Sequence, residues 1–273
     1  MYEKILENIV TIAYYIYNAS DNIKEREEKG SENMEFIDIH SHILPGVDDG
    51  AQSIKESLEM LNIAQNNAIG TIILTPHNKP VRHNVNTSDM EERMEQLRKL
   101  LEASGIRIHL VGGNELYYRN GLVEEICSGM ARTMADSQYV LLEFGPMESY
   151  EYLRSGLYEL LSGGYFPILA HVERYQCLFG LFPKIEELMD MGVYIQVNAG
   201  SIMGDFGFQT KRFTRKLLKR RMVHFIATDA HNTENRAPNL TACAEYVIRK
   251  YGKEYAEDLL WKNPRHVLEN EII

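Results

Sequence analysis

Histidine and aspartate side chains crowd into one short stretch of the chain, DIHSHILPGVDDGA, at residues 38–51. His40 and His42 alternate along a strand-like run, so both side chains point to the same face. A loop rich in glycine and proline follows, and we expect it to fold back so that Asp49 joins the two histidines. Imidazole and carboxylate groups without thiolates are typical ligands of Mn²⁺, Fe, Zn²⁺ or Mg²⁺ in open catalytic sites. The stretch therefore predicts one part of a metal centre.

Residues of the same chemical types follow the other apolar runs of the chain. They are His77, Glu115, Glu143, His171, Asp229 and His231. The last two repeat the i, i+2 spacing, so both can reach one centre. Only the sixth run, VYIQV, supplies no obvious ligand. Ligand-type residues at the ends of six of the seven runs favour a metal cluster over isolated core histidines.

The apolar runs that carry these residues are predicted strands, and they alternate with predicted helices. The runs cover residues 36–40, 71–75, 106–112, 139–144, 166–170, 193–197 and 223–228. The first two helices are each expected to begin at a capping box, Ser53 with Glu56 and Ser88 with Glu91. This alternation predicts parallel β/α units, either doubly wound or closed into a barrel. In both architectures the carboxyl ends of the strands form the active-site face.

Composition narrows the function classes. The 273 residues are 44% hydrophobic and 25% charged, which is ordinary for a globular protein with a sizeable core. A net charge of −10 argues against non-specific binding to nucleic acid or to anionic membranes. The three cysteines are far apart, and no secretory signal or membrane-spanning stretch stands out, so we expect a cytoplasmic protein without stable membrane insertion. The oligomeric state does not follow from the composition.

Residues 1–34 differ from the rest of the chain. An amphipathic pattern near the start predicts a helix, and a polar, charged segment after it predicts a linker. We therefore expect an N-terminal extension at 1–34 and one β/α domain at 35–273. The extension is either the product of an upstream start codon or a helix that binds a partner or a membrane surface.

At the ligand-type residues the chain resembles a known family. The motifs DIHSHILPGVDDGA, TPH, NELYY, LLEF, LAHVERY and TDAHN are similar to those of the PHP (polymerase and histidinol phosphatase) superfamily. Within it they resemble the bacterial manganese-dependent protein-tyrosine phosphatases of capsule and exopolysaccharide operons, the CpsB/YwqE-like group. The resemblance covers about residues 35–273. It implies a distorted seven-stranded (β/α)7 TIM-like barrel that holds two or three manganese ions, with Fe, Zn²⁺ or Mg²⁺ as alternatives.

The resemblance also implies a role for each ligand-type residue. The first metal would bind His40, His42, Glu115 and Asp229, the second Glu115, Glu143 and His171, and the third Asp49, His77 and His231. Arg174 matches the phosphate-binding arginine of the family. His42, Asp229 or a metal-bound water would donate a proton to the leaving group, and the sequence does not choose among them. Asp38 and Asp48 are expected outside the ligand set, Asp38 as a residue that orients a ligand histidine.

The implied function is hydrolysis of phosphotyrosine on a protein. The expected substrate is the phosphorylated tail of an autophosphorylated bacterial tyrosine kinase that controls capsule or exopolysaccharide synthesis. One alternative is a histidinol-phosphate or other small-molecule phosphatase that uses the same metals. Another is a non-catalytic regulatory barrel, which the intact ligand set disfavours.

A basic run, KRFTRKLLKRR, occupies residues 211–221 of this otherwise acidic chain. Two interpretations stay open. The run is either a solvated helix face or a docking surface for an acidic, tyrosine-rich kinase tail.

Overall fold

Short parallel strands form the centre of the protein. The computed structural model describes residues 35–79 and 86–273, so the predicted helix and linker at 1–34 lie outside the described residues. The strands are β1 (Phe36–Ser41), β2 (Ile69–Leu74), β3 (His77–Asn78), β4 (His109–Gly112), β5 (Glu115–Tyr117), β6 (Tyr139–Glu143), β7 (Phe166–Leu169), β8 (Tyr194–Asn198) and β9 (Phe225–Ala227). All seven predicted runs contain a strand, and the strand pairs of the described residues are all parallel, as predicted.

The strands form two sheets, and this division departs from the prediction. One sheet has the order β1-β2-β4 and the other the order β3-β5-β6-β7-β8-β9. The described residues thus contain nine strands rather than seven, because two predicted runs are each followed by an additional short strand in the other sheet. Pro76, which has no amide hydrogen to donate, lies between β2 and β3. Gly113 lies between β4 and β5, where an added Cβ would approach Ile73 to 3.2 Å.

The two sheets curl so that β1 and β9 lie next to each other. The His42 amide donates to the Ala230 carbonyl at 2.8 Å, and the Asp229 amide donates to the His40 carbonyl at 2.9 Å. Ser41 and Ala230 form an isolated parallel bridge. The first and last strands therefore deliver their ends to one place, which a flat sheet would not allow.

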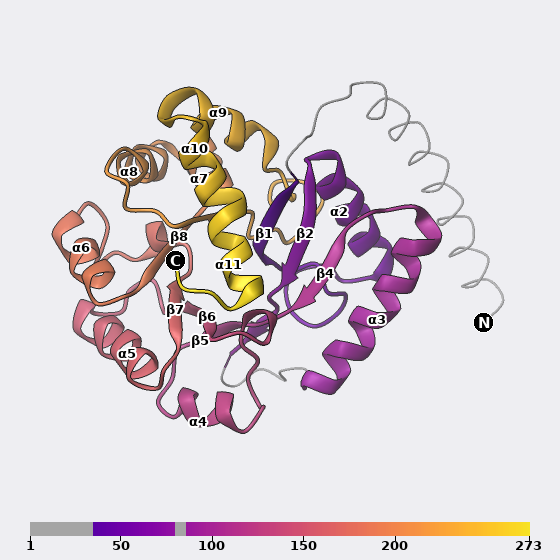
Figure 1. Cartoon of the computed structure of the whole chain (residues 1–273), viewed down its shortest axis with the longest axis horizontal. Helices are drawn as coiled ribbons and strands as arrows, with labels where there is room; N and C mark the ends of the chain where they lie inside the picture. The colour runs from indigo at the N-terminus through magenta and orange to yellow at the C-terminus, as the bar shows by residue number, and fades with distance from the viewer. Residues whose placement is uncertain (1–34, 80–85) are drawn as a thin grey trace.

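Helices surround the strands (Figure 1). They are α2 (Ile54–Asn66), α3 (Thr87–Ser104), α4 (Leu122–Cys127), α5 (Tyr150–Ser162), α6 (Phe182–Asp190), α7 (Ala199–Met203), α8 (Phe208–Lys219), α9 (Thr241–Tyr251), α10 (Lys253–Glu257) and α11 (Asn263–Glu269), with short turns η1 (Met134–Asp136), η2 (Val172–Arg174) and η3 (Asp258–Lys262). No helix of the described residues is long and apolar enough to cross a membrane.

One of the two predicted capping boxes was wrong. The Ser53 hydroxyl accepts a hydrogen bond from the Glu56 amide at 3.2 Å, as predicted. The second helix begins earlier than Ser88, because the Asn86 side chain accepts from the Asp89 amide at 2.8 Å and is the N-cap. Asparagine and serine are both strong N-cap residues, so the local pattern did not distinguish them.

The amino ends of the strands enclose an apolar cluster. It contains Ile37, Tyr139, Leu141 and Phe225, and Val267 of α11 packs onto it. The Tyr139 hydroxyl donates to the Glu271 carbonyl at 2.6 Å, so the end of the chain closes this side of the molecule. The carboxyl ends of the same strands are free to carry polar side chains.

Candidate metal centre

The predicted ligands converge at the carboxyl ends of the strands. Eight of them form four overlapping groups, and within each group the ligand atoms lie within 4.8 Å of one another. The groups are His42, His77 and His231; His40, His42 and Asp229; His40, Glu115 and His171; and His77, Glu115 and Glu143. Their assignment to individual ions stays a prediction, since the groups share members.

Glu115, at the start of β5, lies at the middle of the cluster and is fully buried. One carboxylate oxygen, Oε1, lies 2.8 Å from His171 Nε2 and 3.4 Å from His40 Nε2. The other, Oε2, lies 2.7 Å from His77 Nδ1. Burial opposes the charge of Glu115, but His40 and His77 together hold its pKa well below the usual value. A single carboxylate thus contacts two histidines from different strands, β1 and β3, and a third that follows β7.

Asp49 lies at the rim of the cluster, and its side chain is 54% exposed. Its Oδ1 atom is 3.3 Å from His77 Nε2 and 4.0 Å from His231 Nε2. The preceding loop does fold back over the strand end, because the Ala51 amide donates to the His42 carbonyl at 2.9 Å. Gly50 makes this close approach feasible, since a Cβ there would lie 1.9 Å from the same carbonyl oxygen.

Asp48 orients the His42 ring from outside the cluster. Its Oδ2 atom accepts from His42 Nδ1 at 2.7 Å and from the His77 amide at 3.0 Å. Burial opposes charge on His42, but Asp48 and then Glu115 raise the pKa of His42 to about 10. The other ring nitrogen of His42, Nε2, lies 3.4 Å from Glu115 Oε2 and 3.2 Å from His40 Nε2. This is the arrangement expected of a ligand histidine held by a carboxylate.

The expectation that Asp38 orients a ligand histidine was wrong. Its carboxylate accepts from the backbone amides of His40 at 3.4 Å and Thr228 at 3.0 Å, and it bonds the Thr228 hydroxyl. Asp38 therefore ties β1 to the end of β9 and does not contact the His40 ring. The ring Nδ1 atom of His40 instead lies 3.2 Å from Oε1 of Gln196.

The sixth predicted strand, β8, contributes two residues that sequence reasoning missed. Gln196 Oε1 also accepts from the His171 amide at 2.7 Å, and Gln196 Nε2 donates to Asn198 Oδ1 at 2.8 Å. Asn198 Nδ2 in turn donates to Asp229 Oδ2 at 2.8 Å. The i, i+2 spacing of two amide side chains at a strand end was the available signal.

Two arginines converge on Asp229. Arg174 Nη2 lies 2.6 Å from Asp229 Oδ2, and Arg236 Nη2 lies 2.8 Å from the same atom. Burial opposes the charge of Asp229, and His40 and the two arginines overcome it, so its pKa is lowered. Arg236 was not among the predicted site residues, and its buried Nε atom has no hydrogen-bond partner in the described structure. Arg174 is 35% exposed and can reach a ligand from the cluster side.

The side chains of the cluster fit a cation. Buried carboxylate oxygens and imidazole nitrogens lie within 4.8 Å of one another in each group, and within the described residues the buried Nδ1 atom of His171 has no hydrogen-bond partner. Buried polar atoms are normally satisfied, and unsatisfied ones call for an unseen partner such as an ion. The donor set is nitrogen and oxygen only, which matches hard or borderline divalent metals. Lys79 Nζ, 2.8 Å from Glu143 Oε2, partly offsets the negative charge on one side.

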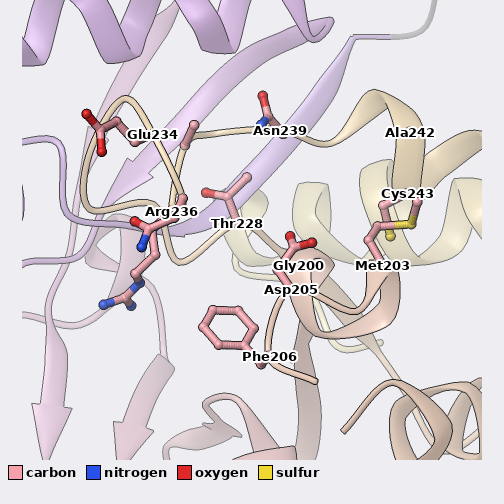
Figure 2. A pocket seen from close by; sticks show the side chains of 12 residues that line it. Gly200, Met203, Asp205, Phe206, Thr228, Glu234, Arg236, Asn239, Ala242 and Cys243 are labelled. Atoms are coloured by element: carbon pink, nitrogen blue, oxygen red, sulfur yellow. The ribbon is translucent and has the colours of Figure 1, made fainter. Parts of the chain in front are cut away.

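A cavity of about 470 Å³ adjoins the cluster (Figure 2). Thr228 and Arg236 line the side near Asp229, and Phe206 and Asp205 line another part of its wall. The Phe206 ring centroid is 5.9 Å from the guanidinium carbon of Arg174. The cavity therefore lies next to Arg236, one of the two arginines that contact Asp229.

Comparison with known proteins agrees with the geometry. Residues 36–269 match the family model described as capsular polysaccharide synthesis, CpsB/CapC. The chain is 32% identical over 244 residues to the tyrosine-protein phosphatase CpsB of Streptococcus pneumoniae, covering 87% of this chain and 100% of the relative. It is 33% identical over 239 residues to the tyrosine-protein phosphatase YwqE of Bacillus subtilis, covering 87% of this chain and 93% of the relative.

A solved structure matches along most of the described chain. It comes from a study of YwqE from Bacillus subtilis and CpsB from Streptococcus pneumoniae, described there as unique metal-dependent tyrosine phosphatases. The TM-score is 0.81 at 33% sequence identity, with 87% of this chain and 96% of the other covered. On the family match and these relatives, the chain belongs to the CpsB/CapC family of capsular polysaccharide synthesis proteins.

Proposed function

We propose that this chain is a metal-dependent protein-tyrosine phosphatase that acts in capsule or exopolysaccharide synthesis. The observation that carries the proposal is the convergence of the predicted His, Asp and Glu side chains in overlapping groups whose ligand atoms lie within 4.8 Å of one another. Relatives that align with 87% of the chain are named tyrosine-protein phosphatases. The expected substrate is the phosphorylated tail of a tyrosine kinase.

The ligand assignment that we propose is the one that the family resemblance implies. His40, His42, Glu115 and Asp229 would hold one ion; Glu115, Glu143 and His171 a second; and Asp49, His77 and His231 a third. We expect Mn²⁺, with Fe, Zn²⁺ or Mg²⁺ as alternatives. When bound, such ions supply positive charge to the phosphoryl oxygens and lower the pKa of a water molecule that attacks phosphorus.

The arginines beside the cluster would bind the phosphoryl oxygens of the substrate. A phosphate monoester presents oxygens that a planar guanidinium can bind in a bidentate manner. Arg174 and Arg236 flank Asp229, so a phosphoryl group at the cluster would lie within reach of both guanidinium groups. Asn198 and Gln196 hold the Asp229 and His171 positions through the hydrogen bonds described above.

A phenolate leaving group makes modest demands on proton donation, since the pKa of tyrosine is about 10. His42 and Asp229 are the candidate donors. Asp229 is the poorer candidate, because the two arginines keep its carboxylate ionised. A site with a weak proton donor suits aryl phosphates better than alkyl phosphates, because an alkoxide leaving group needs a proton.

The finer expectations about the fold and location belong to the same proposal. The β2–β3 and β4–β5 pairs would each represent one interrupted strand of a distorted seven-stranded barrel. The protein would act in the cytoplasm, where tyrosine kinase tails are exposed to it.

The test compares three substrates on metal-stripped protein with and without added Mn²⁺. We expect manganese-dependent hydrolysis of a phosphotyrosine peptide, with little turnover of a phosphoserine peptide or histidinol phosphate. Preference for histidinol phosphate would instead assign the chain to small-molecule metabolism. Bound metal without turnover of any of the three would support a regulatory, non-catalytic barrel.

A further inference from the structure

A second concave surface lies between α6 and α8, outside the metal cluster. It encloses about 440 Å³. Four phenylalanines and two basic residues dominate its lining: Phe179, Phe182, Phe208, Phe213, Arg212 and Lys216. We call it the α6–α8 groove.

Two of the four phenyl rings of the groove are exposed to solvent. Phe208 is 75% exposed and Phe179 is 38% exposed. Phe179 packs on the buried Phe213 with ring centroids 4.5 Å apart, and Phe182 lies 5.8 Å from the same ring. The rings thus form a fixed apolar floor with one ring, Phe208, at its edge. Exposed aromatic side chains that line one concave surface are typical of a binding site.

The charge of the groove is positive on an acidic protein. Helix α8 carries five basic residues and no acidic one between Phe208 and Lys219, while the whole chain has a net charge of −10. Arg212 and Lys216 are exposed, and no carboxylate among residues 35–79 and 86–273 pairs with either within 4 Å. Arg220 lies over the Phe182 ring at 4.3 Å and adds to the positive rim. An unneutralised cationic surface attracts acidic partners.

The groove is connected to the metal cluster by two loops. The loop after β7 carries His171 and Arg174 and continues to Phe179 in the groove. The loop between α7 and α8 carries Phe206, whose ring lies 5.9 Å from the Arg174 guanidinium, and continues to Phe208 at the start of α8. Phe179 is five residues after Arg174 and Phe208 is two residues after Phe206, so the groove begins within the length of a short peptide from Arg174.

The cavity in Figure 2 suits an acidic chain less well. Its lining includes the carboxylates of Asp205 and Glu234 beside the one arginine, Arg236. Acidic side chains there would meet like charges. Charge complementarity therefore assigns the acidic part of a substrate to the α6–α8 groove.

We infer that the α6–α8 groove docks an acidic segment with an aromatic side chain in the polypeptide that carries the phosphotyrosine. The aromatic ring would pack among Phe179, Phe208 and Phe213, and the acidic side chains would pair with Arg212 and Lys216. The inference rests on the proposed phosphatase function for the identity of the neighbouring substrate group. The basic run of the sequence is thus a docking surface rather than a solvated face.

The first experiment measures binding without chemistry. A fluorescently labelled, unphosphorylated peptide of glutamate, glycine and tyrosine is titrated with the full chain and followed by anisotropy. We expect Arg212→Glu/Lys216→Glu to weaken binding at least about 10-fold, since like charges across an interface are costly. The matched control is Lys55→Glu/Lys99→Glu, which makes the same charge change on exposed sites of α2 and α3, on the other side of the molecule from α8 (Figure 1).

A third variant, Phe208→Ala, tests the aromatic part without changing charge. It should weaken binding of the tyrosine peptide more than binding of a control peptide in which glutamine, which has no aromatic ring, replaces each tyrosine. Equal binding of the acidic peptide by wild type and Arg212→Glu/Lys216→Glu would overturn the inference. So would an equal loss in the Lys55→Glu/Lys99→Glu control, or no binding to wild type at low salt.

The second experiment separates docking from the proposed function. For an acidic phosphotyrosine peptide, Arg212→Glu/Lys216→Glu should raise KM about 10-fold, while turnover of a small aryl phosphate stays within about twofold. If wild type binds the acidic peptide through Arg212 and Lys216 but never dephosphorylates it, the proposed function fails and the docking surface stands. If both phosphorylated substrates lose turnover equally, the docking inference fails while the phosphatase stands.

Discussion

Two histidines show how differently the two ends of the strands treat an ionisable group. His42 lies at the carboxyl end of β1, and Asp48 and Glu115 raise its pKa to about 10 against the effect of burial. His224 precedes β9 at the opposite end, where burial lowers its pKa to about 4. His224 Nδ1 accepts from the Ile195 amide at 2.9 Å, and the Tyr194 ring lies beside it. The environment at the carboxyl end thus favours the charged form of histidine, and the environment at the amino end favours the neutral form.

The same strands build both environments. Along β6, Tyr139 and Leu141 belong to the apolar cluster, whereas Glu143, two residues further on the same face, belongs to the metal centre. Apolar burial at one end contributes stability that scales with area. Buried carboxylates and imidazoles at the other end oppose stability unless a cation or a hydrogen bond compensates them. We therefore expect mutations at the carboxyl ends of the strands to affect metal binding and turnover, and mutations at the amino ends to affect the stability of the fold.

The largest effect is expected for His171→Ala at the ligand end. The variant removes a nitrogen 2.8 Å from Glu115 and should lose at least about 1,000-fold in turnover together with bound metal, because the two depend on one cluster. Metal content measured by mass spectrometry and kcat on an aryl phosphate are the readouts. A variant that kept full metal and full activity would remove His171 from the centre.

Leu141→Ala tests the apolar end on the strand that also carries Glu143. We expect the free energy of unfolding to fall by about 2–5 kcal/mol, because a fully buried leucine leaves a cavity. Turnover per bound metal should change little. Chemical denaturation gives the first quantity and metal-normalised kinetics the second.

Glu143→Gln is the control for Leu141→Ala and should show the opposite profile, with reduced metal and turnover and unchanged or increased stability of the metal-free protein. If Glu143→Gln destabilised the metal-free protein as much as Leu141→Ala, the division of labour between the two ends would be refuted.

Arg174→Ala separates phosphate binding from metal binding within the ligand end. The guanidinium contacts Asp229 but is not in any of the ligand groups, so the variant should retain its metal. We expect kcat/KM to fall about 100-fold, which corresponds to about 2.7 kcal/mol of transition-state stabilisation. Arg174→Lys, which keeps the charge but not the planar donor pair, should recover only part of this loss. Metal loss in step with activity would assign Arg174 to the structure of the centre instead.

The smallest effect concerns pH and the apolar end. The pKa of His224 is about 4 in the folded protein, against 6.5 for an unperturbed histidine. Between pH 6.5 and pH 4 the unfolded chain therefore binds a proton at His224 that the folded protein does not. The stability is therefore complete above pH 6.5 and declines as pH falls toward 4. At pH 5 the loss should be about 1–2 kcal/mol. His224→Asn keeps a side-chain acceptor that does not titrate, so metal-free protein with this change should lose less stability between pH 7 and pH 5.

Much of this architecture could be predicted from the sequence because its signals are local. Strand and helix periodicity, the Ser53 cap and the identity of the ligand-type residues all depend on near neighbours in the chain. Their position at strand ends indicated a shared face, because parallel strands place their carboxyl ends together. Local signals failed where two choices were equally good, as at Asn86 and Ser88.

Only the tertiary structure decided which distant groups meet. Glu115 at the middle of three histidines, Gln196 on the His40 ring and Arg236 on Asp229 each join residues from separate strands or loops. The division into two sheets likewise depends on how β3 and β5 pair after each break. The sequence determined the type of each side chain, and the type limits what that side chain can bind. Its partners depend on distances across the fold, because contact between residues far apart in the chain exists only once the strands have curled and packed.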